Sequence, residues 1–241
     1  MNKDQKILVL IITLIVIIAT SFGVYAYKHK DEKKCKTEET DALKFKREYE
    51  EYNDKKYDNG KPYFNINLSN KNLFKYISEE DSVKFLKEGT GVIYFGFPQC
   101  PWCRSLVPYL EEIGKEYGIK EIYYLNISDI RDSYKIEDKK VVVDKKGTDS
   151  YYELLTILDK YLTKFTISDE KGKKYDTGVK RLYAPTTVVV KNGKIVGFNE
   201  GTVPSQEKFV ALTDDEIKEL KDKLSDMFSQ VSSFICTDTG C

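Results

Sequence analysis

The chain has a single histidine, His29, among 241 residues, and its 39 Lys and Arg residues balance 39 Asp and Glu residues. We expect His29 to be a solvated residue, so no catalytic triad built on histidine and no histidine-ligated metal site is available. The chain has zero net charge and so lacks the strong excess of basic residues that is typical of nucleic-acid-binding proteins. We therefore expect no nucleic-acid partner. The chemistry of this chain must therefore be sought in other residue types.

Long apolar runs are equally scarce, because only residues 7–27 form one. At about 1.5 Å per residue this run would make a helix as long as one bilayer core is thick. A secretory signal has a shorter apolar region, of about 7–15 residues. We therefore predict a retained transmembrane anchor over 7–27, after a cytoplasmic tail over 1–6. The alternative is a cleaved signal ending near Val24-Tyr25-Ala26.

Different sequence features favour opposite orientations of this anchor in the membrane. More lysines follow the run than precede it, which favours a cytoplasmic domain, but large domains cross membranes largely regardless of such charges. The six-residue tail matches an uncleaved signal anchor, and five cysteines, four of them in two close pairs, suit an oxidising compartment. We predict a single-pass protein of the cell membrane whose domain is extracytoplasmic.

Residues 28–61 are dense in charge, and we predict a stalk there, largely a solvated spacer. Phe45, Tyr49 and Tyr52 recur at helical spacing behind Thr40-Asp41, which predicts one amphipathic helix in this stalk. A globular domain is expected over 62–235.

Within that domain the hydrophobic pattern predicts alternating strands and helices, and so an α/β fold class. An insert over about 128–180 is expected to be helical. Ser78 and Thr213 are expected helix caps, and Asn192-Gly193 is the expected turn of a hairpin. The predicted strands cover 63–68, 73–77, 91–97, 121–127, 186–190 and 195–198, and the predicted helices follow residues 78, 100, 150 and 213.

Cys100 and Cys103 stand between the buried strand 91–97 and the helix that follows it. The first turn of a helix has unpaired N–H groups and the positive end of the dipole, and both favour a thiolate at Cys100. In such Cys-X-X-Cys motifs the thiol pKa falls from ~8.5 to between ~3.5 and ~7.5. Cys103 lies one turn away and can close a disulfide, so the pair is equipped for thiol–disulfide exchange.

The other three cysteines leave alternatives open. Cys236 and Cys241 are expected to form a local disulfide in a short C-terminal tail, 236–241. The alternatives are a dithiol that exchanges with Cys100 and a zinc site of four thiolates with Cys100 and Cys103. Cys35 could pair two stalks or stay free.

The order of these elements around Cys100 and Cys103 resembles the thioredoxin superfamily. Pro108 stands where that family has a helix-kinking proline, Ala184-Pro185 where it has a cis-proline, and Gly201 where a glycine admits the substrate backbone. The resemblance covers about residues 68–234 apart from the insert. With the anchor and the insert, the chain resembles more narrowly the membrane-anchored thioredoxin-like bacteriocin transport accessory proteins of Gram-positive bacteria.

This resemblance implies a thioredoxin-like fold and a role for each matching residue. Cys100 would be the attacking thiolate and Cys103 the more buried resolving thiol. Pro101 and Trp102 would tune the redox potential, and Ala184, Pro185 and Gly201 would hold an extended substrate. One residue departs from the pattern, because Tyr94 stands where thioredoxins have a buried Asp that helps to deprotonate the resolving thiol. With a reference pKa near ~10, tyrosine is a poor proton acceptor.

We predict a membrane-anchored, extracytoplasmic thiol–disulfide oxidoreductase that exchanges disulfides with proteins or peptides through Cys100 and Cys103. It needs no metal and no organic cofactor, and a membrane protein could be its redox partner. The alternatives are a non-enzymatic binding module for a peptide transporter or secreted peptide and a reductase that faces the cytosol. Arg104, next to the cysteines, is expected to be solvated.

Overall fold

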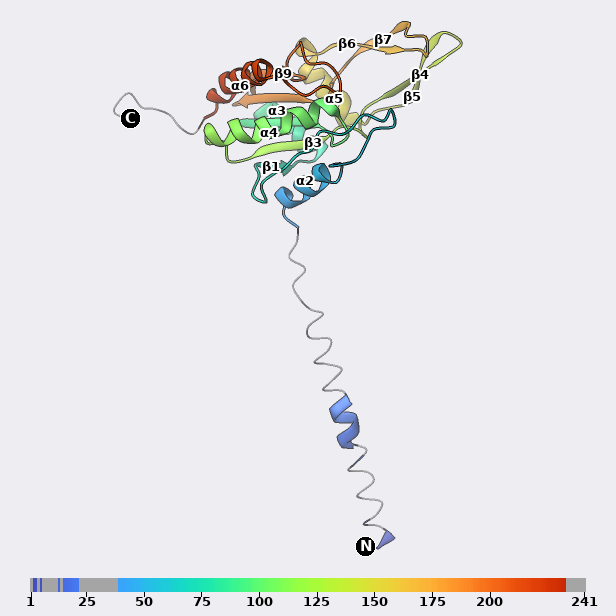
Figure 1. Ribbon diagram of the computed structural model, residues 1–241, viewed down its shortest axis with the longest axis vertical. Coiled ribbons are helices and arrows are strands. Elements are labelled where there is room, and N and C mark those ends of the chain that lie inside the picture. Colours follow the sequence, from blue (N-terminus) through green and yellow to red (C-terminus); the bar gives the residue numbers. More distant parts are fainter. Residues whose placement is uncertain (1, 4, 6–12, 14, 22–38, 233–241) are drawn as a thin grey trace, which may run out of the picture. The chain divides into compact units, whose positions relative to one another are not determined.

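The computed structural model describes residues 2–3, 5, 13, 15–21 and 39–232 (Figure 1). The chain divides into two units, residues 1–39 and 40–241. In the first unit, residues 15–21 are helical. No helix among the described residues combines the length and the apolar character needed to cross a bilayer. Most of the predicted anchor, 7–27, lies outside the described residues, so the anchor and its orientation stay predictions.

The second unit alternates strands and helices, as the sequence pattern predicts. The elements are α2 (Asp41–Glu50), β1 (Phe74–Tyr76), α3 (Glu79–Glu88), β2 (Gly91–Gly96), α4 (Pro101–Glu116), β3 (Ile122–Asn126), β4 (Ser133–Glu137), β5 (Lys140–Lys145), α5 (Asp149–Leu158), the short 3₁₀ helix η1 (Asp159–Tyr161), β6 (Thr163–Ser168), β7 (Lys174–Arg181), β8 (Thr186–Lys191), β9 (Lys194–Glu200) and α6 (Asp214–Ser229). The predicted caps are confirmed, because the hydroxyls of Ser78 and Thr213 accept backbone N–H groups at the starts of α3 and α6.

A mixed sheet with the strand order β1-β3-β2-β8-β9 forms the centre of this unit. β1 and β2 run parallel to β3, which lies between them, whereas β8 is antiparallel to β2 and β9 to β8. The predicted hairpin is confirmed, since Asn192 and Gly193 turn the chain between β8 and β9 with φ of 51° and 71°. β2, which leads into Cys100, is the middle strand.

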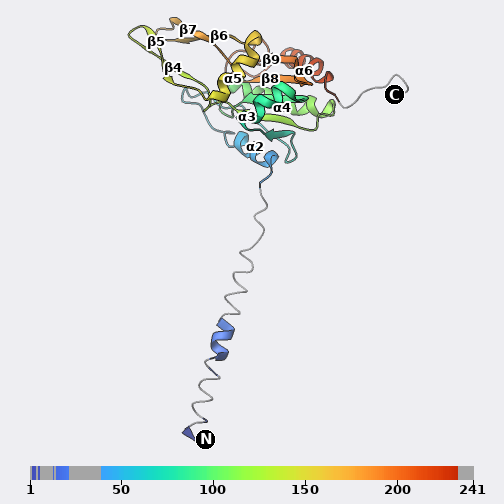
Figure 2. The ribbon, with the colours of Figure 1, turned by 180° about the vertical axis from the view of Figure 1, so that it is seen from behind.

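Helices cover both faces of the sheet, as Figure 1 and, from behind, Figure 2 show. Side chains of a strand point alternately to its two faces. Val92 and Tyr94 of β2 therefore join a core cluster with α2, α4 and α6, whereas Ile93 and Phe95 join a second cluster with α3 and α5. This confirms the mixed α/β class, with a mixed sheet between helices.

The predicted stalk over 28–61 is wrong for its second half. α2 belongs to the second unit, and the side chains of Phe45 and Tyr49 are fully buried there. The Phe45 ring stacks on Phe74 of β1 at 3.9 Å between centroids. The helix is present as predicted, but its apolar stripe is buried although charged residues surround it in the sequence. The globular unit thus begins near Thr40 rather than at residue 62.

The predicted edge strand over 63–68 is also wrong. Ile66 and Leu68 are buried, as their alternation suggests. Their backbone N–H groups, however, bond to side chains that follow or end α2: Ile66 to Asn53 Oδ1 at 2.9 Å and Leu68 to Glu50 Oε1 at 2.8 Å. These side chains take the place of a neighbouring strand, so the segment is a loop fastened to α2.

The predicted helical insert over 128–180 is largely β-structure. Its helix α5 is present, but two antiparallel pairs, β4–β5 and β6–β7, flank it. β4 turns into β5 at Asp138 and Lys139, whose φ values of 48° and 62° lie in the left-handed region. Glycine or asparagine usually signals such a turn, and neither is present here.

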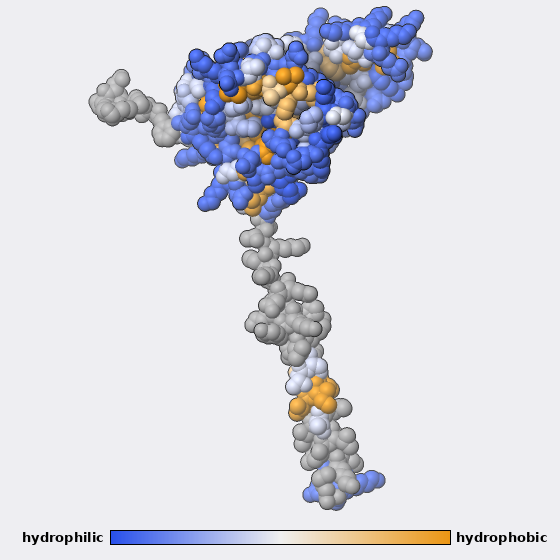
Figure 3. Space-filling model, viewed as in Figure 1, coloured by the Kyte–Doolittle hydropathy of each residue, from blue (hydrophilic) through white to orange (hydrophobic). Residues whose placement is uncertain are grey.

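The surface of this unit is mostly hydrophilic, and blue residues cover most of the face seen in Figure 3. Its exposed large hydrophobic residues are spread over separate elements, with Leu43 in α2, Val143 in β5, Tyr152 in α5 and Val196 in β9 among them.

Candidate active site

Cys100 is the residue that begins α4. Its backbone is still extended, with φ of −74° and ψ of 124°, and Pro101 occupies the first helical position, where a missing N–H is tolerated. The Cys100 sulfur accepts the N–H of Cys103 at 3.4 Å. A cysteine sulfur here does what a serine or aspartate oxygen does at other helix starts, and it faces the positive end of the dipole.

Cys100 and Cys103 are both free thiols with different surroundings. Cys103 is fully buried, and burial raises its pKa well above the ordinary value. A hydrogen bond from the Cys103 thiol lowers the pKa of Cys100, and the N–H groups of Cys103 and Trp102 and the charge of Arg131 act in the same direction. Cys100 is thus the better thiolate of the pair.

The loop before β8 faces Cys100. The Ala184–Pro185 bond is cis, as predicted, and the Cys100 thiol donates a hydrogen bond to the Ala184 carbonyl at 3.3 Å. Gly201 donates its N–H to the Pro185 carbonyl at 2.8 Å. With φ of +79°, Gly201 has a backbone that L side chains rarely adopt. The structure therefore brings Ala184, Pro185 and Gly201 to the cysteines.

A pocket of ≈ 300 Å³ opens beside these residues, with Trp102, Ala184 and Gly201 in its wall. Glu200 also lines it; burial raises the pKa of this carboxyl, and its Oε2 atom has no hydrogen-bond partner. Glu200 was not predicted as a site residue, although its place next to Gly201 is a usable signal. A larger cleft of ≈ 620 Å³, between β4–β5 and β6–β7, has no cysteine in its wall.

Two buried tyrosines lie beneath the cysteines. Tyr94 of β2 is the predicted departure from the thioredoxin pattern, and it is fully buried. Its hydroxyl is hydrogen-bonded to the hydroxyl of Tyr49 in α2, 2.9 Å away, and a hydrogen bond from Tyr94 lowers the pKa of the Cys103 thiol. Tyr49 was not predicted at the site, because the stalk was expected to include its helix.

Arg104 is buried, with 1% of its surface exposed, which corrects the expectation that it is solvated. Its guanidinium donates to the carbonyls of Phe64 and Tyr49 at 2.7 Å each, to the Pro98 carbonyl at 3.3 Å and to Asn53 Oδ1 at 2.8 Å. Burial lowers the pKa of Arg104. The planar donor fork thus ties the first turn of α4 to the chain that follows α2.

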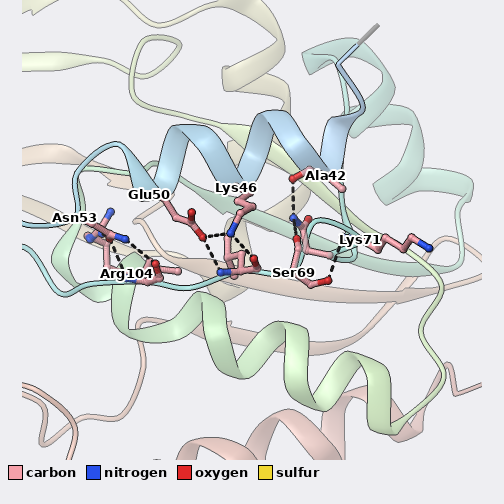
Figure 4. A network of polar contacts seen from close by, with 10 residues as sticks. Ala42, Lys46, Glu50, Asn53, Ser69, Lys71 and Arg104 are labelled. Atoms are coloured by element: carbon pink, nitrogen blue, oxygen red, sulfur yellow. Dashed lines mark hydrogen bonds and ion pairs between the residues drawn. The ribbon is translucent and has the colours of Figure 1, made fainter. Parts of the chain in front are cut away.

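The same side of the sheet carries a polar network between α2 and the loop after it (Figure 4). Lys46 donates to the Leu68 carbonyl at 2.6 Å and pairs with Glu50, and the Asn72 amide donates to the Ala42 carbonyl at 2.7 Å. With Arg104, these contacts fix α2, and so Tyr49, against the cysteine-bearing helix.

The other three cysteines, Cys35, Cys236 and Cys241, lie outside the described residues. Their predicted pairing therefore stays a prediction. No family model and no curated protein matches this chain.

Proposed function

We propose that this protein is a thiol–disulfide oxidoreductase of thioredoxin-like fold, with Cys100 as its nucleophile and Cys103 as its resolving thiol. The observation that carries the proposal is the asymmetry of the pair: Cys100 begins α4 with a lowered pKa, whereas Cys103 is buried with a raised one. The cis-proline loop against Cys100 supports it, since its backbone could hold an extended peptide.

The reaction needs only these two sulfurs. The Cys100 thiolate attacks one sulfur of a substrate disulfide, the substrate S–S bond breaks, and the other substrate sulfur leaves as a thiolate that takes up a proton. Cys103 then loses its proton and attacks Cys100. The Cys100–Cys103 disulfide forms, the second substrate sulfur is released, and the substrate has gained two electrons. The same steps in reverse oxidise a dithiol, and the reduction potential of the pair decides the direction.

The substrates in this proposal are disulfides or thiols of proteins and peptides. An extended chain beside Ala184 and Pro185 would bring its cysteine to Cys100, and a neighbouring side chain would enter the pocket beside Trp102 and Gly201.

Trapping of mixed disulfides tests this proposal. The Cys103→Ser variant should accumulate substrate attached to Cys100, because the second step is blocked, whereas Cys100→Ser should trap little. An oxidised protein, such as insulin, is the probe for the free Cys100 thiol. A reduced and unfolded secreted protein is the probe after Cys100 has been converted to its mixed disulfide with glutathione, which then leaves as glutathione thiol. Mass spectrometry assigns the site. Equal trapping by both variants would overturn the order of attack. Peptide binding that survives replacement of both cysteines, without any trapping, would favour the non-enzymatic binding module.

We further propose that the domain is held at the outer face of the cell membrane by residues 7–27. The support is the apolar run itself. The full chain should stay in the membrane fraction after alkaline extraction, and a protease added to intact cells should remove the domain. Release of the full chain into the soluble fraction would contradict the anchor, and protection from the protease would contradict the orientation.

A further inference from the structure

A row of hydrogen-bonding groups runs from α2 to the cysteine pair. The hydroxyls of Tyr49 and Tyr94 are 2.9 Å apart, and both side chains are fully buried. A hydrogen bond from Tyr94 lowers the pKa of the Cys103 thiol, and the Cys103 N–H donates to the Cys100 sulfur at 3.4 Å. Four groups from three elements thus form one continuous row that ends at the nucleophile.

The fold makes room for this row at Gly96. A Cβ atom built on Gly96 would lie 2.1 Å from the Tyr94 hydroxyl oxygen and 2.4 Å from the ring carbon that bears it. Tyr94 and Gly96 are two residues apart on β2 and therefore face the same side. The absence of a side chain at residue 96 lets the Tyr94 hydroxyl lie over the end of the strand.

Tyr49 is held in place from α2. Its ring stacks on Phe45 at 4.4 Å and meets Tyr124 edge-on at 6.2 Å between centroids. The Arg104 guanidinium donates to the Tyr49 carbonyl at 2.7 Å. Both the ring and the backbone of Tyr49 are therefore fixed with respect to Cys103.

A carboxylate is not the partner of Cys103 in the part of the chain that the structure describes. The buried carboxylates there are Glu111 and Asp132. Glu111 pairs with Lys115 farther along α4, and Asp132 accepts the Tyr152 hydroxyl at 2.6 Å and the Gly147 N–H at 2.7 Å in the insert. The charged and titratable groups that act on Cys103 are Cys100, the three tyrosines 49, 94 and 124, Tyr57 and Arg131.

A hydroxyl has one proton to donate and can accept as well. Either hydroxyl can donate in the Tyr49–Tyr94 hydrogen bond, and when Tyr49 is the donor the Tyr94 proton remains for Cys103. Burial raises the pKa of both tyrosines well above the ordinary value, so they stay protonated and act as donors rather than as bases. Hydrogen bonds to the charged form of a group stabilise that form.

We propose that Tyr94 donates the hydrogen bond that stabilises the Cys103 thiolate during resolution, and that Tyr49 is a positioning residue which orients the Tyr94 proton toward Cys103. This inference rests on the proposed function. In the step concerned, Cys103 loses its proton, its sulfur attacks Cys100, the bond from Cys100 to the substrate sulfur breaks, and the departing substrate thiolate takes up a proton. Tyr94 keeps its own proton throughout.

The test compares Tyr94→Phe and Tyr49→Phe with Tyr76→Phe in the full chain. Tyr76 belongs to the same aromatic cluster, but its hydroxyl donates to Glu48 at 2.7 Å, so this variant is the matched control. The first readout is the rate at which a mixed disulfide preformed on Cys100 releases its thiol. We expect about a tenfold loss in Tyr94→Phe, corresponding to one unit in the pKa of Cys103, a smaller loss in Tyr49→Phe, and no change in the control.

The second readout does not need turnover. In a Cys100→Ala background, alkylation of Cys103 by a small reagent, quantified by mass spectrometry, reports its thiolate fraction at a fixed pH. Adding Tyr94→Phe should slow this alkylation about tenfold, whereas adding Tyr76→Phe should not. Equal rates in these two variants, whether both unchanged or both slowed, would overturn the inference. Slowed Cys103 alkylation in a protein that never resolves mixed disulfides would support the Tyr94 hydrogen bond to the Cys103 thiolate but overturn its role in resolution and the proposed function.

Discussion

Two cysteines three residues apart have opposite character because of where each lies on α4. Cys100 stands before the first turn and receives N–H groups, while Cys103, one turn later, points into the core. Position in a helix thus separates the pKa values of two chemically identical groups.

The lowered pKa of Cys100 predicts its reactivity at low pH. A group whose pKa is lowered is half-deprotonated at a lower pH than usual, so Cys100 should still alkylate at a pH where a free cysteine, with a pKa of ~8.5, has become slow. Cys103 should react slowly throughout. Stopped alkylation with peptide mapping gives both profiles. If Cys100 reached its half-maximal alkylation rate at a higher pH than free cysteine does, the assignment would be contradicted.

Glu200 predicts a pH-dependent change in stability. Its pKa is raised by burial, so its charged form is disfavoured in the folded protein, and the cost appears as pH rises through the ordinary pKa toward the raised one. Glu200→Gln removes that charge and should stabilise the protein at pH 7 and leave its stability unchanged near pH 4. Urea unfolding at the two pH values measures this. Destabilisation at pH 7 would show that the carboxylate is satisfied in the folded state.

At the scale of elements, the residues that begin helices could be predicted from the sequence, because helix capping depends on neighbouring residues only. Ser78, Cys100 and Thr213 each begin a helix because each offers a side-chain acceptor to backbone N–H groups. Burial was harder to predict. Arg104 looks solvated in the sequence, and only the carbonyls that converge on it from distant segments explain its place in the core.

The position of α2 is the element-scale claim most open to test. Phe45 is fully buried, whereas Leu43 on the same helix is 39% exposed. Phe45→Ala should lower the free energy of unfolding by about 3–5 kcal/mol, the usual range for a buried aromatic side chain. Leu43→Ala should lower it by under about 1 kcal/mol, as is usual for a surface position. Urea denaturation of both variants is the measurement. If both variants lost a similarly small free energy of unfolding, α2 would be part of a solvated stalk and not of the core.

At the scale of the whole molecule, the order of strands and helices and the place of Cys100 could be predicted, because alternating apolar residues and turn signals are local. The hairpins β4–β5 and β6–β7 could not, since the turn at Asp138 and Lys139 lacks the usual residues. The link between α2 and the cysteines was missed for the same kind of reason. It depends on contacts such as Tyr49 with Tyr94, 45 residues apart, which no local pattern encodes.

A redox titration tests the central claim most directly. The reduced protein is equilibrated in glutathione buffers of graded potential, and thiols at residues 100 and 103 are quantified by alkylation and peptide mapping. We predict that both thiols disappear together in one reversible two-electron transition. The ratio of reduced to oxidised protein should change tenfold for about every 30 mV, and the midpoint should lie between about −270 and −120 mV. Cys100 and Cys103 that both remain alkylatable across this whole range would contradict the account.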